Sequence, residues 1–156
     1  MPLFMHTSTM PPAREACIAS AVAYYARPTD PVSPAGLSDI VHAIIRVEGG
    51  TTGQIHWNNP DAKGERSYDM GLMQINSSHL SELTELGATQ RDVTNNECLN
   101  IFVGTWILKR SIAASPNLWT AIGNYNTGSL NPKTVAANYR YISKVWAQLQ
   151  RLWHGE

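Results

Sequence analysis

The sequence predicts a mainly α-helical domain with a small β-hairpin inserted into it. Apolar residues recur at helical spacing in several segments along the chain. Glycine, proline and capping residues stand at the ends of these segments. In contrast, residues 51–70 are polar and irregular, and the short runs IHW and RSYDM in this region suit the two strands of a hairpin.

The first two helices are expected on either side of a turn-rich connector. Apolar periodicity after Pro12 predicts a helix that ends near Arg27, and the connector PTDPVSP follows it. Ser33 and Pro34 then suit the N-cap and the first turn of a second helix. That helix would reach Glu48, where two consecutive glycines end it.

Four further helices are expected in the remainder of the chain. A short one is predicted over residues 79–86, where a glycine follows it. TNNE at 94–97 matches the capping-box pattern and would open an apolar-striped helix that ends near residue 114. Another short helix is predicted over 118–125, and Asn131-Pro132 would open the last one.

Glu48 lies where a buried helix should carry only apolar residues. Counting back from Glu48 by helical spacing gives Ile45, Ile44 and Val41 on the same face. Because desolvation disfavours a charged carboxylate, an apolar setting costs free energy and raises a carboxyl pKa. This cost indicates that a glutamate at this position serves a function.

Composition excludes several classes of function. Twelve Lys and Arg balance twelve Asp and Glu, so the bulk charge indicates no nucleic acid or other polyanionic partner. No apolar run approaches the length that would span a membrane. The five histidines and two cysteines show no paired ligand spacing, so we expect no metal site and no cofactor.

The domain boundaries and the cysteines leave two questions open. We expect residues 1–11 to form a flexible leader and residues 12–156 to form a single domain; this leader lacks the basic start and the apolar stretch of a secretory signal. Cys17 and Cys98 are either two unrelated buried thiols or one disulfide. A disulfide would imply an oxidising compartment, and closing so long a loop would add roughly 4 kcal/mol of stability.

Two polar segments follow the glutamate at a distance. In SYDMGLMQINS at 67–77, Gly71 permits a sharp turn, and Gln74 and Asn76 offer both donors and acceptors, as sugar hydroxyl and acetamido groups require. GNYNTG at 123–128 places an aromatic residue between amides and glycines. Each segment by itself is more commonly a simple turn.

The order of these motifs resembles that of the lysozyme-like lytic transglycosylases. A helix-borne glutamate, then GLMQIN, then NYNTG, then a late helix with RYISKVW covers residues 17–146. ECLNIFVGTWIL and the early cysteine are most similar to the specialised transglycosylases of conjugation, type III and type IV secretion systems and pili. The resemblance implies a Cys17–Cys98 disulfide, a lysozyme-like fold and an exported or periplasmic protein that acts on peptidoglycan, with components of such an apparatus as further partners.

The resemblance also implies a role for individual residues. Glu48 would be the general acid and base that cleaves the bond between N-acetylmuramic acid and N-acetylglucosamine. The sugar-binding residues would be Gly71, Met73, Gln74, Tyr125, Asn126 and Tyr141. Two departures stand out: the family mostly reads E-S-G where this chain reads E-G-G, and N-A-G where it reads N-T-G.

Two other functions remain open. SYDMGLMQINS also resembles a stretch of animal-type lysozyme, in which Asp69 would be the second carboxylate of a hydrolytic muramidase. A simpler interpretation makes Asp69 a hairpin residue that bonds neighbouring amides. The third hypothesis is a non-catalytic peptidoglycan-binding scaffold module. Overall similarity to the secretion-associated group favours the transglycosylase, whose product is a 1,6-anhydro sugar.

Overall fold

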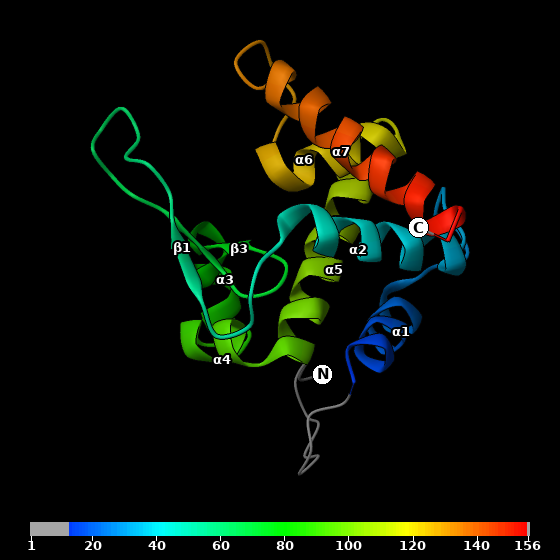
Figure 1. The fold of residues 1–156 in the computed structure, drawn as a ribbon. Helices are drawn as coiled ribbons and strands as arrows, with labels where there is room; N and C mark the ends of the chain where they lie inside the picture. The colour runs from blue at the N-terminus through cyan, green and yellow to red at the C-terminus, as the bar shows by residue number, and fades with distance from the viewer. Residues whose placement is uncertain (1–12, 156) are drawn as a thin grey trace. The chain divides into compact units, whose positions relative to one another are not determined.

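The computed structural model describes residues 13–155, so the expected leader at residues 1–11 lies outside the described residues (Figure 1). The mainly helical fold with a small sheet is confirmed. The elements in chain order are α1 (Arg14–Tyr25), α2 (Pro34–Glu48), β1 (Ile55–Trp57), β2 (Tyr68–Met70), β3 (Ile75–Asn76), the 3₁₀ turn η1 (Ser77–His79), α3 (Leu80–Glu85), α4 (Gln90–Asn95), α5 (Glu97–Ala114), α6 (Leu118–Thr127) and α7 (Val135–Trp153).

The chain divides into two compact units. The first unit comprises residues 1–17 and 48–104, and the second comprises 18–47 and 105–156. The sheet, η1, α3 and α4 belong to the first unit, whereas α6 and α7 belong to the second. In the described part of the chain, no helix combines the length and apolar character that crossing a bilayer requires.

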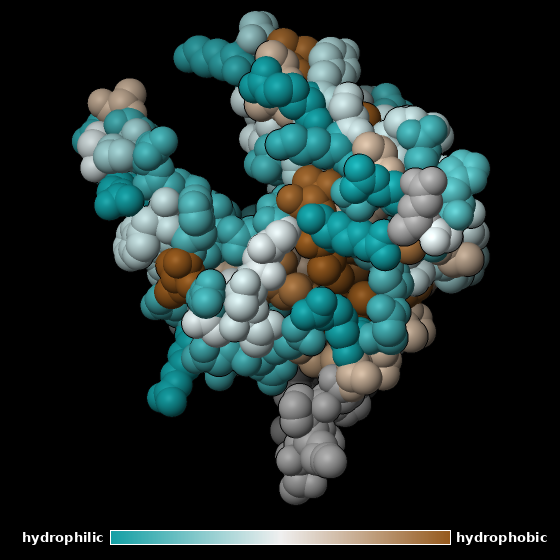
Figure 2. Space-filling model, viewed as in Figure 1, coloured by the Kyte–Doolittle hydropathy of each residue, from teal (hydrophilic) through white to brown (hydrophobic). Residues whose placement is uncertain are grey.

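The first unit contains the predicted hairpin and one strand more. β1 pairs antiparallel with β2, which places Trp57 opposite Tyr68, and β2 pairs antiparallel with β3. β3 has only two residues, too few for a periodic pattern to predict. The loop between β1 and β2 turns on Asp61, whose carboxylate accepts the backbone N–H groups of Lys63 and Glu65. Figure 2 shows a mostly hydrophilic surface at this tip.

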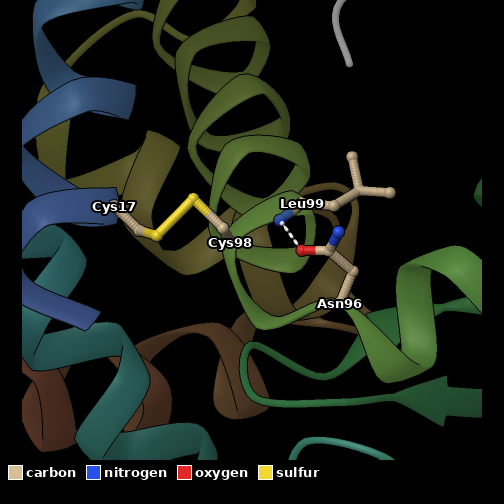
Figure 3. The surroundings of a disulfide bond; sticks show 4 residues. All are labelled: Cys17, Asn96, Cys98 and Leu99. Carbon is tan, nitrogen blue, oxygen red and sulfur yellow. Dashed lines mark hydrogen bonds between the residues drawn. A yellow bond between two sulfur atoms is a disulfide. The ribbon is translucent and has the colours of Figure 1, made fainter. Parts of the chain in front are cut away.

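Near residue 90, the positions at which helices begin differ from the prediction. Residues 90–95 form α4, and its capping box uses Thr89 and Asp92 instead of the TNNE pattern. Thr94 lies inside α4, where its hydroxyl donates to the carbonyl of Gln90. Asn96 then opens α5, because its side-chain oxygen accepts the backbone N–H of Leu99 at 3.0 Å (Figure 3).

A disulfide joins Cys17 at the start of α1 to Cys98 at the start of α5, as the resemblance implied (Figure 3). Their Cα atoms lie 5.3 Å apart, and 81 positions separate them in the sequence. Beside this link, Arg14 donates to the carboxylate of Glu97 at 2.8 Å, and the Thr52 hydroxyl donates to the same oxygen at 2.9 Å. The beginnings of α1 and α5 are therefore connected by both a covalent bond and an ion pair.

The core of the second unit includes side chains from α1, α2, α5, α6 and α7. Side chains buried there include those of Val41, Ile44, Ile122, Val145 and Leu149. α6 and α7 pack against each other, and at Gly123 they come so close that a Cβ atom would overlap the side chain of Asn138.

A largely buried ion pair lies in the same unit. Lys109 of α5 pairs with Asp30, and their side chains are only 12% and 10% exposed. Burial opposes ionisation of Asp30, but its hydrogen bonds from Lys109 and the Arg27 backbone outweigh burial and lower its pKa. The carboxylate is therefore charged wherever the protein is folded near neutral pH.

Candidate active site

Glu48 is the last residue of α2 and is half-buried. Val41, Ile44 and Ile45, which precede it at helical spacing, are buried as the sequence indicated. The C-terminal end of a helix carries partial negative charge, which disfavours a second negative charge on a nearby carboxylate. The predicted general acid therefore lies at the end of an apolar helix.

The two glycines after Glu48 fix the chain where it leaves α2. Gly49 has a left-handed conformation with φ of +61°, in which an L side chain is strained by about 1 kcal/mol or more. A glycine therefore suits this backbone better than the family's serine. Gly50 lies directly against the segment 71–74, because a Cβ atom there would overlap the carbonyl oxygens of Gly71 and Leu72. The turn after Glu48 is thus packed onto the predicted sugar-binding segment.

The segment 71–74 is held in an uncommon conformation. Gly71 has φ of +65°, and its N–H donates to the carbonyl of Gln54 at 2.9 Å. Gln74 has φ of +53°, and it is the only non-glycine residue within 13–155 whose φ is positive. Its side-chain amide donates to the carbonyl of Gly71 at 2.9 Å and closes the turn. Strained backbone of this kind persists where surrounding contacts determine it, and such sites are commonly functional.

The residues of this segment differ in how far solvent reaches them. Met73, which the resemblance placed at the sugar, is fully buried, and so is Leu72. Gln74 and Asn76 are only partly buried. Polar contacts from this segment to a ligand would therefore come from Gln74 and the neighbouring backbone, while Met73 packs beneath them.

Asn100 of α5 anchors the segment from the core, which sequence reasoning missed. It is 1% exposed, and its side-chain oxygen accepts the N–H of Met73 at 2.8 Å. Its amide donates to the carbonyls of Met70 and Val93, both at 2.9 Å. The signal in the sequence was an asparagine within the apolar ECLNIFVGTWIL, since a buried amide must find partners in another segment.

Asp69 lies in β2 opposite Asn76, and the side-chain amide of Asn76 donates to its carboxylate at 2.9 Å. Asn76 also caps η1, because its side-chain oxygen accepts the N–H of Ser78. The Asp69 carboxylate therefore has a structural partner within the sheet, as the simpler interpretation expects.

The remaining predicted residues lie together in the second unit. The rings of Tyr125 on α6 and Tyr141 on α7 stack with centroids 6.5 Å apart and an interplanar angle of 19°. Asn126 is exposed, whereas Tyr141 is buried. The structure thus groups Glu48 with the segment 71–74 in the first unit, and Tyr125 with Tyr141 in the second.

This geometry agrees with the comparisons to known proteins. Residues 34–146 match the family model described as Transglycosylase SLT domain. The chain belongs to this family. Over 115 residues it is 31% identical to the Invasion protein IagB of Salmonella typhimurium, which covers 74% of this chain and 69% of that protein.

Two further relatives support the assignment to this family. A Peptidoglycan-binding-like protein of Escherichia coli O157:H7 is 37% identical over 93 residues, 58% of this chain and 56% of that protein. Protein IpgF of Shigella flexneri is 27% identical over 116 residues, 74% of this chain and 72% of that protein. Within residues 13–155, no three His, Cys, Asp or Glu side chains are grouped to hold a metal ion.

Proposed function

We propose that this protein is a peptidoglycan lytic transglycosylase with Glu48 as its general acid and base. It would cleave the β-1,4 bond between N-acetylmuramic acid and N-acetylglucosamine and leave a 1,6-anhydro-muramic acid end. One observation supports this above the others: Gly50 packs the turn after Glu48 onto the strained segment 71–74. Through that contact, the carboxyl of Glu48 would lie near amide groups suited to sugars.

The proposed reaction needs only one carboxyl group from the protein. Glu48 gives its proton to the glycosidic oxygen as the bond from that oxygen to C1 of the muramic acid breaks. The acetamido oxygen of the same sugar stabilises the positive charge at C1. The 6-hydroxyl oxygen then attacks C1, and Glu48 takes up the hydroxyl proton. No water is consumed, so the product is one water lighter than that of hydrolysis.

Binding of the glycan would involve both polar segments of the sequence. Gly71 and Gln74 would contact sugar from the first unit. The family motif supports the same role for Tyr125, Asn126 and Tyr141. We expect an exposed Asn126 to contact an acetamido group, and a stack of two tyrosines to give a rigid edge.

The cellular role is part of the proposal. The Cys17–Cys98 disulfide supports an exported protein in an oxidising compartment, the periplasm in particular. The relative named Invasion protein supports a role in opening the cell wall for a secretion or conjugation apparatus. Proteins of that apparatus would then be partners in addition to the glycan.

Mass spectrometry of digested peptidoglycan tests the reaction. We expect muropeptides that are one water lighter than reducing ends, and Glu48→Gln should lower the rate by about 10²–10⁴-fold. Reducing ends in place of anhydro ends would favour the muramidase, with Asp69 as its second carboxylate. Undiminished cleavage by the Glu48→Gln variant would refute the assignment of Glu48, and binding without any cleavage would favour the scaffold.

A further inference from the structure

The zero net charge of the chain hides an uneven distribution. The first unit carries four Lys and Arg against nine Asp and Glu, and the second carries eight against three. From Thr105 to Gly155 the chain has six Lys and Arg and neither Asp nor Glu. Because screening limits exposed charges to a range of roughly 10 Å, this stretch acts on a ligand by its own charge and not by the total.

α7 arranges part of this charge beside aromatic residues. Tyr139, Trp146 and Trp153 follow one another at intervals of seven residues, so they form one stripe along the helix, the aromatic stripe. Arg140, Lys144 and Arg151 are spaced by four and seven residues and form a second line, the cationic stripe.

The two stripes lie on the solvent side of the helix. All six side chains are exposed; Tyr139 is 60% and Trp153 is 55% accessible. The side of α7 that packs into the core uses other residues, which include Val145 and Leu149. Ser143 and Ala147 lie between the two stripes. Both residues are small and exposed, so the helix surface between the aromatic and the cationic side chains is shallow.

The tryptophans are held in fixed positions although they are exposed. Trp146 contacts Trp119 of α6 edge to face at 5.6 Å between ring centroids, and it contacts Trp153 in the same way at 5.8 Å. The indole N–H of Trp153 donates to the carboxylate of Asp39 at 3.0 Å. A ligand that contacts these rings would find them already ordered, which lowers the entropic cost of binding.

The cationic stripe, in contrast, forms no ion pair within residues 13–155. Among the described residues, no Asp or Glu forms an ion pair with Arg140, Lys144 or Arg151. Guanidinium and ammonium groups in this arrangement are available to the carboxylates of a ligand.

We propose that the exposed face of α7 is a second binding surface for peptidoglycan, separate from the residues proposed to cleave it. The aromatic stripe would contact the apolar faces of the sugar rings, and the cationic stripe would bind the carboxylates of the peptide stems. This inference rests on the proposed function for its ligand, and an anionic glycan supplies both sugar rings for the aromatic stripe and carboxylates for the cationic stripe. It would retain the enzyme on an insoluble wall between cleavage events.

A membrane surface fits these observations less well. Binding at a bilayer interface requires large apolar side chains that enter the acyl region. The solvent side of α7 offers half-covered indoles and small or polar residues, and no Leu, Ile, Met or Phe is among the exposed side chains of this helix. A lipid surface is therefore an outcome for the experiment to exclude.

Sedimentation with purified, insoluble peptidoglycan tests the proposal, with Glu48→Gln as the background so that cleavage does not interfere. Lys144→Glu with Arg151→Glu should weaken binding roughly tenfold, because two attractions become repulsions. The matched control is Lys63→Glu with Arg91→Glu, which makes the same charge change at exposed positions of the first unit and should bind like its parent. Circular dichroism and thermal unfolding check that each protein is folded.

Two further measurements separate the contributions. Tyr139→Ser should weaken binding severalfold without changing the charge. Chitin, an uncharged β-1,4 glycan, should bind more weakly than peptidoglycan and should be indifferent to Lys144→Gln with Arg151→Gln. These neutral substitutions also replace the charge reversals if the latter fail to fold.

Each outcome decides the proposal separately from the proposed function. Equal binding by the α7 variants and their parent would overturn it, as would α7-dependent binding to phosphatidylglycerol vesicles with none to peptidoglycan. The wild-type protein is assayed in parallel on soluble, uncross-linked glycan strands. If the wild-type protein cleaves these strands but the α7 substitutions do not change binding to the wall, the proposed enzymatic function stands and the second binding surface is refuted. Wall binding through α7 without cleavage of any glycan would do the reverse.

Discussion

Replacing Asn100 by alanine should destabilise the protein strongly, because one side chain satisfies three buried backbone groups. The variant loses hydrogen bonds of 2.8, 2.9 and 2.9 Å to Met73, Met70 and Val93. A net loss of about 1 kcal/mol for each bond, together with desolvated partners, gives about 3–5 kcal/mol. Small domains are stable by roughly 5–15 kcal/mol, so the variant should still fold.

Urea unfolding followed by tryptophan fluorescence measures this loss. Asn95→Ala is the control, since it makes the same chemical change at an exposed residue and should cost less than about 0.5 kcal/mol. Asn100→Asp keeps the acceptor for the Met73 N–H but turns both donors into an anion facing two carbonyls, so it too should be destabilised. A loss below about 1 kcal/mol for Asn100→Ala would refute the idea that this residue anchors the segment 71–74.

The anchor also predicts an effect on catalysis. Under conditions in which Asn100→Ala is fully folded, its rate of peptidoglycan cleavage should still fall, because the backbone at Met73 and Gln74 is no longer held. A rate equal to that of Asn95→Ala at matched folded fraction would show that the loss is one of stability alone.

Three other perturbations have equally direct outcomes. Asp69→Asn should remain active and release anhydro products at a stability cost of about 1 kcal/mol; a folded, inactive variant of a parent that yields reducing ends would instead indicate hydrolysis. Cys17→Ser with Cys98→Ser should lower the free energy of unfolding by about 4 kcal/mol, and a reductant should bring the wild-type protein to the same value. Lys109→Met, which leaves Asp30 buried without its cation, should cost about 3 kcal/mol at pH 7. The folded pKa of Asp30 is lowered from its ordinary 3.8, so the stability that this carboxylate contributes is present above that pH and is lost as the pH falls below it. The free energy of unfolding should therefore depend less on pH in the acid range for Lys109→Met than for the wild-type protein.

Element boundaries could be predicted where side chains act locally. α2 spans Pro34–Glu48 as the Ser33-Pro34 start and the paired glycines indicated. α4 was missed because it has only six residues, and its capping box, Thr89 with Asp92, is a pattern that TNNE further along also matched. Only the hydrogen bonds in the folded chain distinguish one such pattern from the other.

The site could be predicted in part, for a related reason. The order of motifs indicated Glu48 and the segment 71–74 as candidates, and that is information carried by sequence alone. The contact of Gly50 with Gly71, and the bonds from Asn100 to Met73, join segments about twenty or more residues apart. No periodicity or propensity encodes such a contact. A glycine pair and an asparagine in an apolar helix show that something is required there, but not which segment meets it.

The total charge of this chain is a correct but incomplete guide to its partners. A sum of zero over the whole chain indicates no anionic partner. Exposed charges, however, act over a range of only roughly 10 Å, so a ligand responds to the charges near its binding surface and not to the sum. At that range α7 presents Arg140, Lys144 and Arg151 without an acidic neighbour on the same helix. Affinity for an anionic glycan therefore depends on local patterning, and it should fall with salt even though the protein as a whole is neutral.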